Sequence, residues 1–447
     1  MVFNELDDAH SAIVECKTYY KNGDKRKAVN KLLEYYQNRD NVTWLFNHKD
    51  KARLIQQYRA LCPEEIKSVV AVADSQLNGW WYWQKRYWNC GTPPNWLEKK
   101  EDNEYQIQLN RHPMFHVLGL AYWLTGNEKY AEAYTSMLAG WIDNIKMPDI
   151  KKYQDEKAWY VIQPWSLLNT GIRPKIWFES MEYFIGAPSF NADLLVRVLY
   201  SFIQHGKMLR EVSSVAFPRA DHNWYLMLME GLFYVGTMLP ELKTSHSDIS
   251  QAMNELNRCM RTQVLEDGVH IEETPGYHNG AIGWFGAPLL LAKRNNMQFD
   301  SVYINKMEKM FNFSSHMTRP NHTVAPFGDS RPDTGGDWIF AFGSLIFGKK
   351  ITAQEGRIYG PAFWFTNGAL ADSPDQNKNP VVKTDFPLNA YFPKGGFYCM
   401  RSSWDDNALY LAFRNGKAWF DSLRMAGHKH ADHLSFDMSA YGSPLIV

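Results

Sequence analysis

The sequence lacks several features that would assign it to a broad class. It has no net charge, because 48 Lys and Arg residues balance 48 Asp and Glu residues, and it has no long block of like charges. This excludes the electrostatic footprint of a general nucleic-acid-binding protein. It has no run of about 18 apolar residues, so we expect no membrane association. Neither a GxGxxG nor a Walker pattern occurs, which excludes the common dinucleotide and phosphate-binding loops.

Cysteine is scarce, and no secretion signal is evident. The five cysteines are dispersed, odd in number and without a CxxC pair, so neither a disulfide framework nor a cysteine zinc site is expected. Residues 1–24 carry charges throughout and contain no apolar core of a signal peptide. We therefore expect a cytoplasmic location, or a periplasmic or secreted one if a leader has been removed. The oligomeric state is left open.

Aromatic residues are abundant, at 15% of the chain with 17 tryptophans. They cluster in Trp80-Trp81-Tyr82-Trp83 and Tyr87-Trp88. Sugar rings stack well on such faces, whereas packing in a core is the alternative reading for any single tryptophan. The cluster as a whole favours a carbohydrate-binding surface.

The apolar pattern predicts helices first and strands afterwards. Helical spacing recurs from the N-terminus to about residue 315, and this half is predicted to be all-α, closed into a barrel of helical hairpins. Representative helices are expected over 114–124, 130–145, 193–209, 224–238 and 282–293. Residues 366–384 are rich in Asn, Asp, Pro, Ser and Lys and predict a linker or long loop.

Short runs with glycine breaks follow that loop and predict antiparallel strands, over 396–400, 408–413 and 434–438. We therefore expect two domains, a helical domain over 1–380 and a β domain over 381–447. The segment 443–447 resembles a strand stopped halfway, so we expect the sequence to end inside its β domain.

The densest polar cluster is Gly427-His428-Lys429-His430-Ala431-Asp432-His433. In an extended chain, His428, His430 and Asp432 would share one face and His433 would lie on the other. Such a face suits zinc binding, acid–base catalysis or a plain polar edge, and the residues alone leave these three readings open.

Three further polar clusters precede or interrupt apolar segments. Residues 219–224 hold Asp221, His222 and Asn223, of which Asp221 or Asn223 could simply be a helix N-cap. Residues 272–279 pair Glu272 with Glu273 ahead of Tyr277, and paired carboxylates are typical of glycosidases. Residues 327–331, Phe-Gly-Asp-Ser-Arg, predict a turn whose Asp and Arg pair with each other.

Together these clusters resemble the heparinase II/III-like polysaccharide lyases. The resemblance is carried by Asn-Trp before an apolar helix ending in Leu-Pro-Glu (223–241), by Pro-Gly-Tyr-His (275–278), and by Gly-His-Lys-His-Ala-Asp-His-Leu-Ser-Phe (427–436). Asn110-Arg111-His112 and the segment 119–130 are similar to that family's N-terminal toroid. The resemblance covers roughly residues 105 to 447 and implies an (α/α) toroid, an incomplete helical barrel, followed by an antiparallel β-sandwich domain.

The resemblance also implies roles for individual residues. Asn223 would neutralise a uronate carboxylate, Tyr277 would be the catalytic acid and a candidate for the base as well, and His428 would be the second base or a carboxylate partner. His430 would match a metal-binding histidine of some members, where zinc or calcium has a structural role. The remaining ligands of such a site are expected further along the β domain, beyond Val447, so the metal site is expected to be incomplete in this chain. The chemistry itself needs no cofactor. Trp224 stands where some relatives carry a second neutralising histidine, so that group is either absent or supplied by His222 or His278.

Arg111, His112, Arg173 and Trp81 are predicted to complete the substrate-binding surface.

The chemistry that this implies is β-elimination in an acidic polysaccharide. The proton next to a uronate carboxylate is poorly acidic until donors stabilise the second negative charge on the carboxylate oxygens. Heparan sulfate or a low-sulfate glycosaminoglycan such as hyaluronan is the expected substrate, and alginate is the second choice.

Two rival functions remain at this stage. One is a glycoside hydrolase on a helical toroid that uses two of Glu272, Glu273, Asp329 and Asp432. The other is a glycan-binding protein without catalytic activity.

Overall fold

A computed structural model describes residues 2–83, 86–157, 163–213, 215, 219–332, 337–348, 363–364, 386–416 and 428–446 of the chain. The chain forms two compact units. The first comprises Met1–Pro218 and Met227–Asn254, and the second comprises Arg219–Leu226 and Glu255–Val447. Helices α13 (Asn223–Met238) and α14 (Ser245–Gln263) contribute residues to both.

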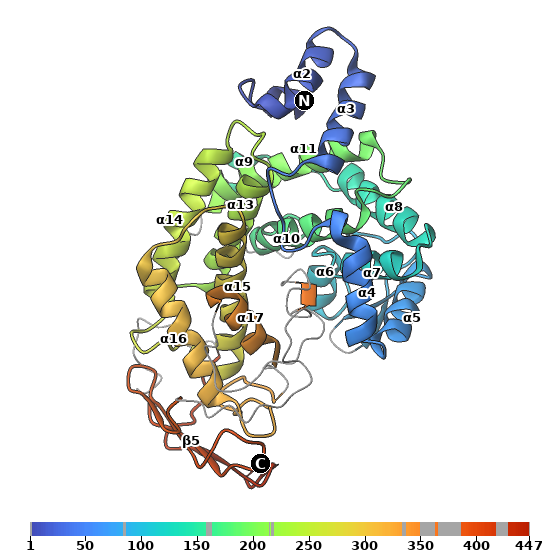
Figure 1. The fold of residues 1–447 in the computed structure, drawn as a ribbon. Helices are drawn as coiled ribbons and strands as arrows, with labels where there is room; N and C mark the ends of the chain where they lie inside the picture. Colours follow the sequence, from blue (N-terminus) through green and yellow to red (C-terminus); the bar gives the residue numbers. More distant parts are fainter. Residues whose placement is uncertain are drawn as a thin grey trace. The chain divides into compact units, whose positions relative to one another are not determined.

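Helices follow one another through the first unit (Figure 1). They are α1 (Val2–Glu5), α2 (Val14–Lys21), α3 (Lys25–Asn38), α4 (Lys51–Leu61), α5 (Glu65–Leu77), α6 (Asn103–Leu109), α7 (Met114–Thr125), α8 (Lys129–Asn144), α9 (Ile150–Asp155), α10 (Leu167–Phe184) and α11 (Ala192–Met208), with the 3₁₀ turns η1 (Ser11–Ile13) and η2 (His48–Asp50) and the π-helical turn η4 (Leu209–Ser213).

Local signals in the sequence set many of these boundaries. The Asn191 side chain accepts a hydrogen bond from the Leu194 amide and starts α11, as Asp24 starts α3 by accepting from Lys27. Gly126 ends α7 in the left-handed conformation with φ of 68°, which glycine adopts without steric cost. The helices predicted over 114–124, 130–145, 193–209 and 224–238 are confirmed to within two residues at either end.

A short hairpin interrupts the helices of the first unit. Strands β1 (Trp80–Trp83) and β2 (Arg86–Asn89) pair antiparallel, with Trp81 opposite Trp88. The prediction of an all-α half is therefore wrong here. The segment is rich in aromatic residues, which favour strands, and its period-2 alternation buries Trp81 and Trp83 while Trp80 and Tyr82 stay exposed.

Small residues let the apolar helix α13 pack tightly in the first unit. A Cβ atom on Gly231 would lie 2.3 Å from the carbonyl oxygen of Gly171 in α10, and one on Gly171 would lie 2.8 Å from the carbonyl oxygen of Met227. The two helix backbones therefore touch, with no space for a side chain between them. Any residue larger than glycine at 171 or 231 would force the helices apart.

The second unit combines helices with the antiparallel sheet (Figure 1). Its helices are α15 (Pro275–Arg294), α16 (Ser301–Met317) and α17 (Asp337–Phe347), and its strands are β3 (Ala390–Phe392), β4 (Phe397–Arg401), β5 (Tyr410–Arg414), β6 (Phe436–Ala440) and β7 (Ser443–Pro444). The strands form one sheet in the order β3-β4-β5-β6-β7.

One face of this sheet packs on the end of α16 and the segment after it. The shared core comprises Val269, Phe313, Met317, Ala325, Phe327, Phe392, Phe397, Cys399, Tyr410 and Ala412. A buried ion pair adds to it, because Arg319 donates two hydrogen bonds to the carboxylate of Asp437 in β6. The sheet and helix α16 therefore share one core, which fixes the loops between them.

The change from helices to strands is confirmed, and so is the strand content after residue 386. Helix α15 was predicted to begin only at residue 282, but it begins at Pro275. Its first two turns hold Gly276, Gly280 and polar residues, which hide the apolar period. The predicted linker over 366–384 and the domain boundary at 380 lie outside the described residues.

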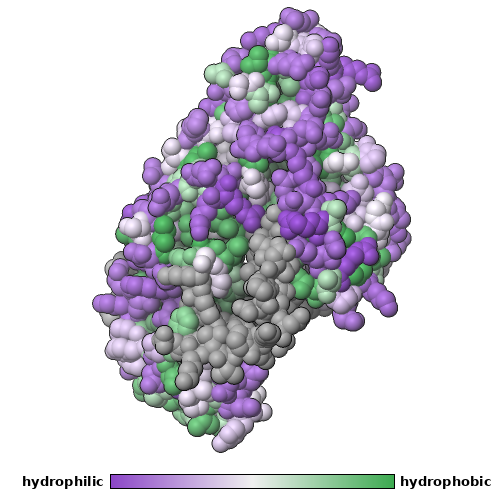
Figure 2. All heavy atoms as spheres, in the orientation of Figure 1, coloured by the Kyte–Doolittle hydropathy of each residue, from purple (hydrophilic) through white to green (hydrophobic). Residues whose placement is uncertain are grey.

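No helix among the described residues is both long and apolar enough to cross a membrane. On the face drawn in Figure 2, hydrophobic side chains gather in separate patches between hydrophilic ones.

Candidate active site

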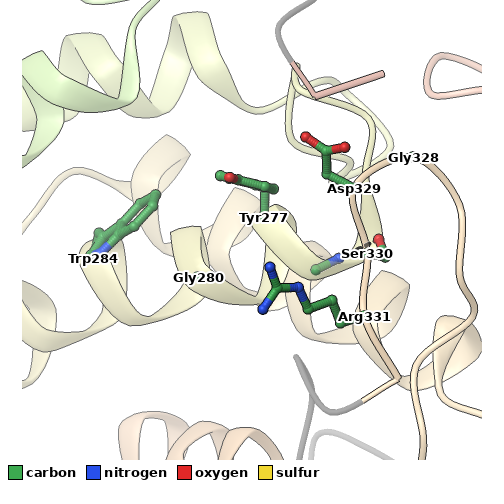
Figure 3. Close-up of a pocket in the computed structure, with 8 residues that line it drawn as sticks. Tyr277, Gly280, Trp284, Gly328, Asp329, Ser330 and Arg331 are labelled. Atoms are coloured by element: carbon green, nitrogen blue, oxygen red, sulfur yellow. Dashed lines mark hydrogen bonds between the residues drawn. The ribbon is translucent and has the colours of Figure 1, made fainter. Parts of the chain in front are cut away.

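A pocket of about 670 Å³ opens in the second unit (Figure 3). It is lined by Gly276, Tyr277, Gly280, Trp284, Gly328, Asp329, Ser330 and Arg331. Helix α15 forms one side, where Tyr277, Gly280 and Trp284 follow one another at helical spacing. The segment 328–331 forms the other side, and its Arg331 side chain extends toward α15. Two of the predicted polar clusters therefore meet in this pocket.

Tyr277 lies in the first turn of α15, rather than in the predicted turn before a helix. Pro275 occupies the first position of the helix, where its missing N–H costs nothing. The amide of Gly276 donates to the Ser330 hydroxyl at 2.9 Å and ties the helix start to the opposite side of the pocket. Tyr277 is thus placed by a fixed helix end instead of a free loop.

His428 stacks directly on the Tyr277 ring. The ring centroids lie 3.6 Å apart with an angle of 15° between the planes. These residues are far apart in the sequence, and their separate motifs gave no sign of ring contact. The structure brings together two of the three residues to which the family resemblance assigns catalytic roles.

Asp329 orients both histidines of the His-Lys-His motif. Its carboxylate lies 2.9 Å from Nδ1 of His428 and 2.6 Å from Nε2 of His430, and its amide donates to the His428 carbonyl at 3.0 Å. The hydrogen bond from His428 lowers the pKa of Asp329 below its usual range. An ionised Asp329 accepts a hydrogen bond from the Nδ1–H group of His428, which leaves Nε2 as the ring nitrogen with a free lone pair.

Gly328 allows this close approach between the two segments. Its φ is 59°, in the left-handed region that favours glycine. A Cβ atom there would lie 2.3 Å from Cγ2 of Thr274 and 2.6 Å from the carbonyl oxygen of His428. The glycine of the Phe-Gly-Asp-Ser-Arg motif is therefore required by packing as well as by its backbone conformation.

Asn223 begins helix α13 and contacts Glu272. Its Nδ2 donates to Oε1 of Glu272 at 3.1 Å, and the same oxygen lies 3.9 Å from Nε2 of His428. Glu272 is only 3% exposed, and burial raises its pKa to about 7 although His428 acts in the opposite direction. The third predicted catalytic residue therefore reaches the other two through one buried carboxyl group.

A buried ion network fixes the segments on which these residues lie. Arg414 in β5 donates to Glu273 at 2.9 Å and to Asp432 at 3.2 Å, and Lys429 lies 3.1 Å from the same Glu273 oxygen. Asp432 also accepts from the amide of Gly328 at 2.9 Å. Strand β5 thus links the residues before α15, the motif around His428 and the loop before Asp329.

Glu273, which belongs to this network, adopts an uncommon backbone conformation. Its φ is 50°, in the left-handed region that is costly for a residue with a side chain. Its side chain is 2% exposed and is paired with both Arg414 and Lys429. Burial in two ion pairs stabilises the conformation and removes Glu273 from acid–base chemistry.

The structure contradicts direct substrate contact for three predicted residues in the first unit. His112, Arg173 and Trp81 are each fully buried. Arg173 lies over the rings of Trp141 and Trp165 and donates to carbonyl oxygens, and burial lowers its pKa to about 9. These side chains belong to an aromatic core, so the predicted sugar contacts are wrong.

His278 is a fourth correction. It is fully buried, its Nδ1 accepts from the amide of His270 at 3.2 Å, and its Nε2 lies 2.9 Å from the carbonyl oxygen of Met310. Burial lowers its pKa to about 4, so it is neutral at neutral pH, and it does not line the pocket. Its motif made it look like a site residue because it follows Tyr277, but successive residues of a helix face different directions.

Two other predicted binding residues stay accessible in part. Arg111 is half-buried and donates from Nε to Oδ1 of Asn169 at 3.0 Å. His222 is half-buried beside Asn223, its Nδ1 accepts from the amide of Trp224 at 3.1 Å, and burial lowers its pKa. Both remain predictions.

The metal role of His430 also remains a prediction. His430 is exposed and shares Asp329 with His428, and the described residues hold no group of three His, Cys, Asp or Glu arranged for a metal ion. His430 and Asp329 supply two donors, whereas a structural zinc site uses about four.

Sequence reasoning missed Trp284 and did not give Arg331 or Glu272 its place in this site. Trp284 lies about two turns after Tyr277 on the same face of α15, a spacing that would have pointed to it had the helix start been recognised. Arg331 was read as part of a turn and Glu272 as one of a glycosidase pair. No local pattern could show that Glu272 touches Asn223.

Comparisons with known proteins match the chain to two family models. The family described as heparinase II/III N-terminus matches residues 2–345, and the one described as heparinase II/III-like, C-terminal matches residues 387–447. A heparin-sulfate lyase of Bacteroides stercoris is 25% identical over 442 residues, covering 94% of this chain and 60% of that protein. A heparin-sulfate lyase of Pedobacter heparinus is 26% identical over 425 residues, covering 92% and 58% respectively.

Solved structures show the same fold. A crystal structure of heparinase III matches with a TM-score of 0.76 at 21% identity and covers 99% of this chain and 66% of that one. A heparan sulfate lyase from Pedobacter heparinus matches with a TM-score of 0.66 at 23% identity, covering 99% and 64%. The predicted fold class, a helical toroid followed by an antiparallel β-sandwich domain, is thereby confirmed. The chain spans about three fifths of the length of the curated relatives it matches. With family matches covering most of its residues, the chain belongs to the heparinase II/III family.

Proposed function

We propose that this protein is a polysaccharide lyase that cleaves a uronic-acid-containing glycosaminoglycan by β-elimination. The observation that carries the proposal is the stack of His428 on Tyr277 with centroids 3.6 Å apart, beside the amide of Asn223. A base, an acid and a carboxylate-binding donor are the groups that this elimination requires. The curated relatives are named heparin-sulfate lyases, which supports the same reaction.

Asn223 is proposed to bind the uronate carboxylate. When the proton leaves the neighbouring carbon, a second negative charge develops on the carboxylate oxygens. A side-chain amide directed at those oxygens stabilises this charge more strongly in the transition state than in the ground state. Asn223 is only 9% exposed, so its donor acts where little water competes.

His428 is proposed as the base and Tyr277 as the acid. Asp329 accepts from Nδ1 of His428, which leaves the Nε2 lone pair to take the proton from the carbon next to the carboxylate. The electrons of that C–H bond form the new double bond as the glycosidic C–O bond breaks. The departing oxygen then takes the Tyr277 hydroxyl proton. Transfer of the proton from His428 to solvent and return of a proton to Tyr277 close the cycle.

The pocket also favours a carboxylated sugar over a densely sulfated one. Trp284 offers an aromatic face two turns from Tyr277, on which a sugar ring can stack. Arg331 is the basic side chain among the residues that line the pocket. Arg219, Arg414 and Lys429 of the same unit are each paired with carboxylates, so few cations are available to sulfate groups. Low-sulfate heparan sulfate, or hyaluronan, is the substrate class that this arrangement supports.

Product analysis tests the proposal. The enzyme is incubated with a panel of uronate polysaccharides, and new ultraviolet absorbance from the unsaturated uronate is followed together with new reducing ends. Elimination predicts both signals in equal amounts. The Tyr277→Phe variant should give neither, and Tyr391→Phe, which alters a 60% exposed tyrosine of β3, should behave as wild type.

The two rivals predict different outcomes. Reducing ends without absorbance would show a hydrolase, and binding without either signal would show a glycan-binding protein. The carboxylates available for hydrolysis are reduced in number, since Glu273 and Asp432 are held by Arg414.

A further inference from the structure

Glu272 contacts two of the three proposed catalytic residues, yet the proposed mechanism gives it no role. Its Oε1 accepts from Nδ2 of Asn223 at 3.1 Å and lies 3.9 Å from Nε2 of His428. Its side chain is 3% exposed, and Oε2 has no hydrogen-bond partner among the described residues. A buried carboxyl group with one free oxygen therefore lies where a substrate carboxylate is proposed to bind.

Within the described part of the chain, no Lys or Arg side chain forms an ion pair with Glu272. Among the described residues its ion-pair partners are only His270, 3.6 Å from Oε2, and His428. Burial lowers the pKa of His270 to about 3, and burial also lowers that of His222, the neighbour of Asn223, so neither carries charge at neutral pH. The nearby cations Arg414 and Lys429 pair with Glu273 instead.

This environment favours the neutral acid. Burial without a cationic partner disfavours a carboxylate, and the pKa of Glu272 is raised to about 7. A bound uronate would place a second negative charge beside it and raise that pKa further. The substrate therefore favours uptake of a proton by Glu272.

The amide of Asn223 has two ends that bind different partners. Its NH₂ group donates two hydrogen bonds and its oxygen only accepts. Here one hydrogen of Nδ2 is given to Glu272, while Oδ1 is buried without a hydrogen-bond partner among the described residues. A half-turn of the amide exchanges its ends. A protonated Glu272 can then donate to Oδ1, and both Nδ2 hydrogens become available to a ligand.

We propose that Glu272 is the positioning residue for Asn223. In its protonated form, Glu272 donates a hydrogen bond to Oδ1 of Asn223, and this directs both Nδ2 hydrogens of Asn223 to the substrate carboxylate. When ionised, Glu272 captures Nδ2 and repels the substrate carboxylate. The inference rests on the proposed lyase function and deepens it, because it makes recognition of the carboxylate depend on a proton. It also explains why a carboxyl group lies beside a site for a carboxylate.

The pH profile of turnover tests this assignment. The kcat/KM values of wild type, Glu272→Gln and Glu272→Ala are measured with a heparan sulfate substrate between about pH 5 and pH 10. Glutamine donates at every pH, so E272Q should retain activity within about fivefold at the wild-type optimum, with its alkaline limb moved up by about one pH unit or more. E272A should lose about 30-fold or more in kcat with KM changed less than about threefold, because the amide is no longer oriented.

Glu266→Gln is the matched control. Glu266 is exposed in the same unit and pairs with Lys306 at 3.3 Å, away from Asn223. It should keep the wild-type profile. An E272Q profile whose alkaline limb coincides with that of wild type, or an E272A variant with wild-type kcat, would overturn the inference.

A second measurement does not depend on turnover and does not require any change at position 272. A heparan sulfate tetrasaccharide is titrated into the Tyr277→Phe enzyme by calorimetry at about pH 8, in buffers of different ionisation enthalpy. Binding should take up close to one proton, and the uptake should vanish when E272Q is added. Binding without proton uptake contradicts the inference even if E272Q fails to fold.

The two possible failures can be told apart. A wild-type enzyme that forms no unsaturated product from any uronate polysaccharide overturns the proposed function, and this inference with it. Normal product formation with no proton uptake and an unshifted profile overturns the role of Glu272 alone.

Discussion

Replacing Asn223 by alanine separates transition-state stabilisation from simple substrate binding. The side chain is buried at the start of α13 and donates a hydrogen bond to Glu272 at 3.1 Å. Loss of one preorganised donor to a developing oxyanion costs about 3–4 kcal/mol, which lowers kcat by about 100- to 1000-fold. KM should change far less, because the interaction strengthens as the second negative charge develops.

The effect on stability should be small by comparison. Removing the amide takes one hydrogen bond from a buried carboxyl group, and such a loss costs about 1–3 kcal/mol. Glu272 can stay protonated and then carries no unpaired charge. The loss in free energy of unfolding should therefore lie at the lower end of that range. The melting temperature should therefore fall by only a few degrees.

The assay is the initial rate of ultraviolet absorbance at several substrate concentrations, with thermal melts of the same samples. Asn321→Ala provides a control, because this amide accepts hydrogen bonds from Thr323 in a turn of the same unit. It should leave kcat unchanged. An Asn223→Ala effect confined to KM would refute the reasoning and reduce Asn223 to a substrate-binding residue.

Further predictions concern the groups around this amide. Tyr277→Phe removes one hydroxyl group and should lower kcat by at least about 100-fold with an unchanged melting temperature, since general acid catalysis contributes about 10²–10⁴; wild-type rates would exclude Tyr277 as the acid. Asp329→Asn weakens the charged hydrogen bond to His428, worth about 1.5–3 kcal/mol, and should lower kcat about 10- to 100-fold in steady-state assays. Arg414→Met leaves the buried Glu273 and the partly buried Asp432 without their shared partner and should destabilise the fold by about 3–5 kcal/mol, seen as a lower melting temperature; an unchanged melt would show the network to be dispensable. The raised pKa of Glu272 means that the folded protein holds a proton that the unfolded chain releases above its ordinary pKa near 4.5, so stability should fall as pH rises from about 4.5 to about 7. E272Q lacks this ionisation and should lose less stability over that range in thermal melts, whereas identical slopes would contradict the shift.

Residues from three segments that are distant in the sequence form this site, and the side chain of Arg414 connects these segments. Arg414 joins Glu273, next to Glu272, to Asp432, which in turn accepts from Gly328 beside Asp329. The network contains no proposed catalytic group. Its physical effect is to hold histidine and tyrosine rings in contact, which a flexible loop could not do without a large entropic cost.

Much of the architecture was predictable because it depends on local signals. Apolar spacing and caps such as Gly126 determined the helices, and period-2 runs determined β4, β5 and β6. The errors arose where local signals are weak or conflict. Glycines and polar residues concealed the first turns of α15, and the aromatic strands β1 and β2 were hidden inside a helical context.

The sequence by itself determined the order of helices and strands, the family, and the identity of Asn223, Tyr277 and His428 as candidates, because motif order and side-chain chemistry are written along the chain. Exposure was decided only by the tertiary structure. It buried Arg173 among tryptophans and placed Trp284 beside the pocket instead.

Proton affinities and contacts were likewise decided only in three dimensions. The pKa of Glu272 depends on how much water and which charges surround it, and the stack of Tyr277 on His428 depends on segments more than a hundred residues apart in the chain. Burial and through-space electrostatics are properties of the folded arrangement. A motif can therefore name the reacting groups, and the fold determines which of them carries a proton.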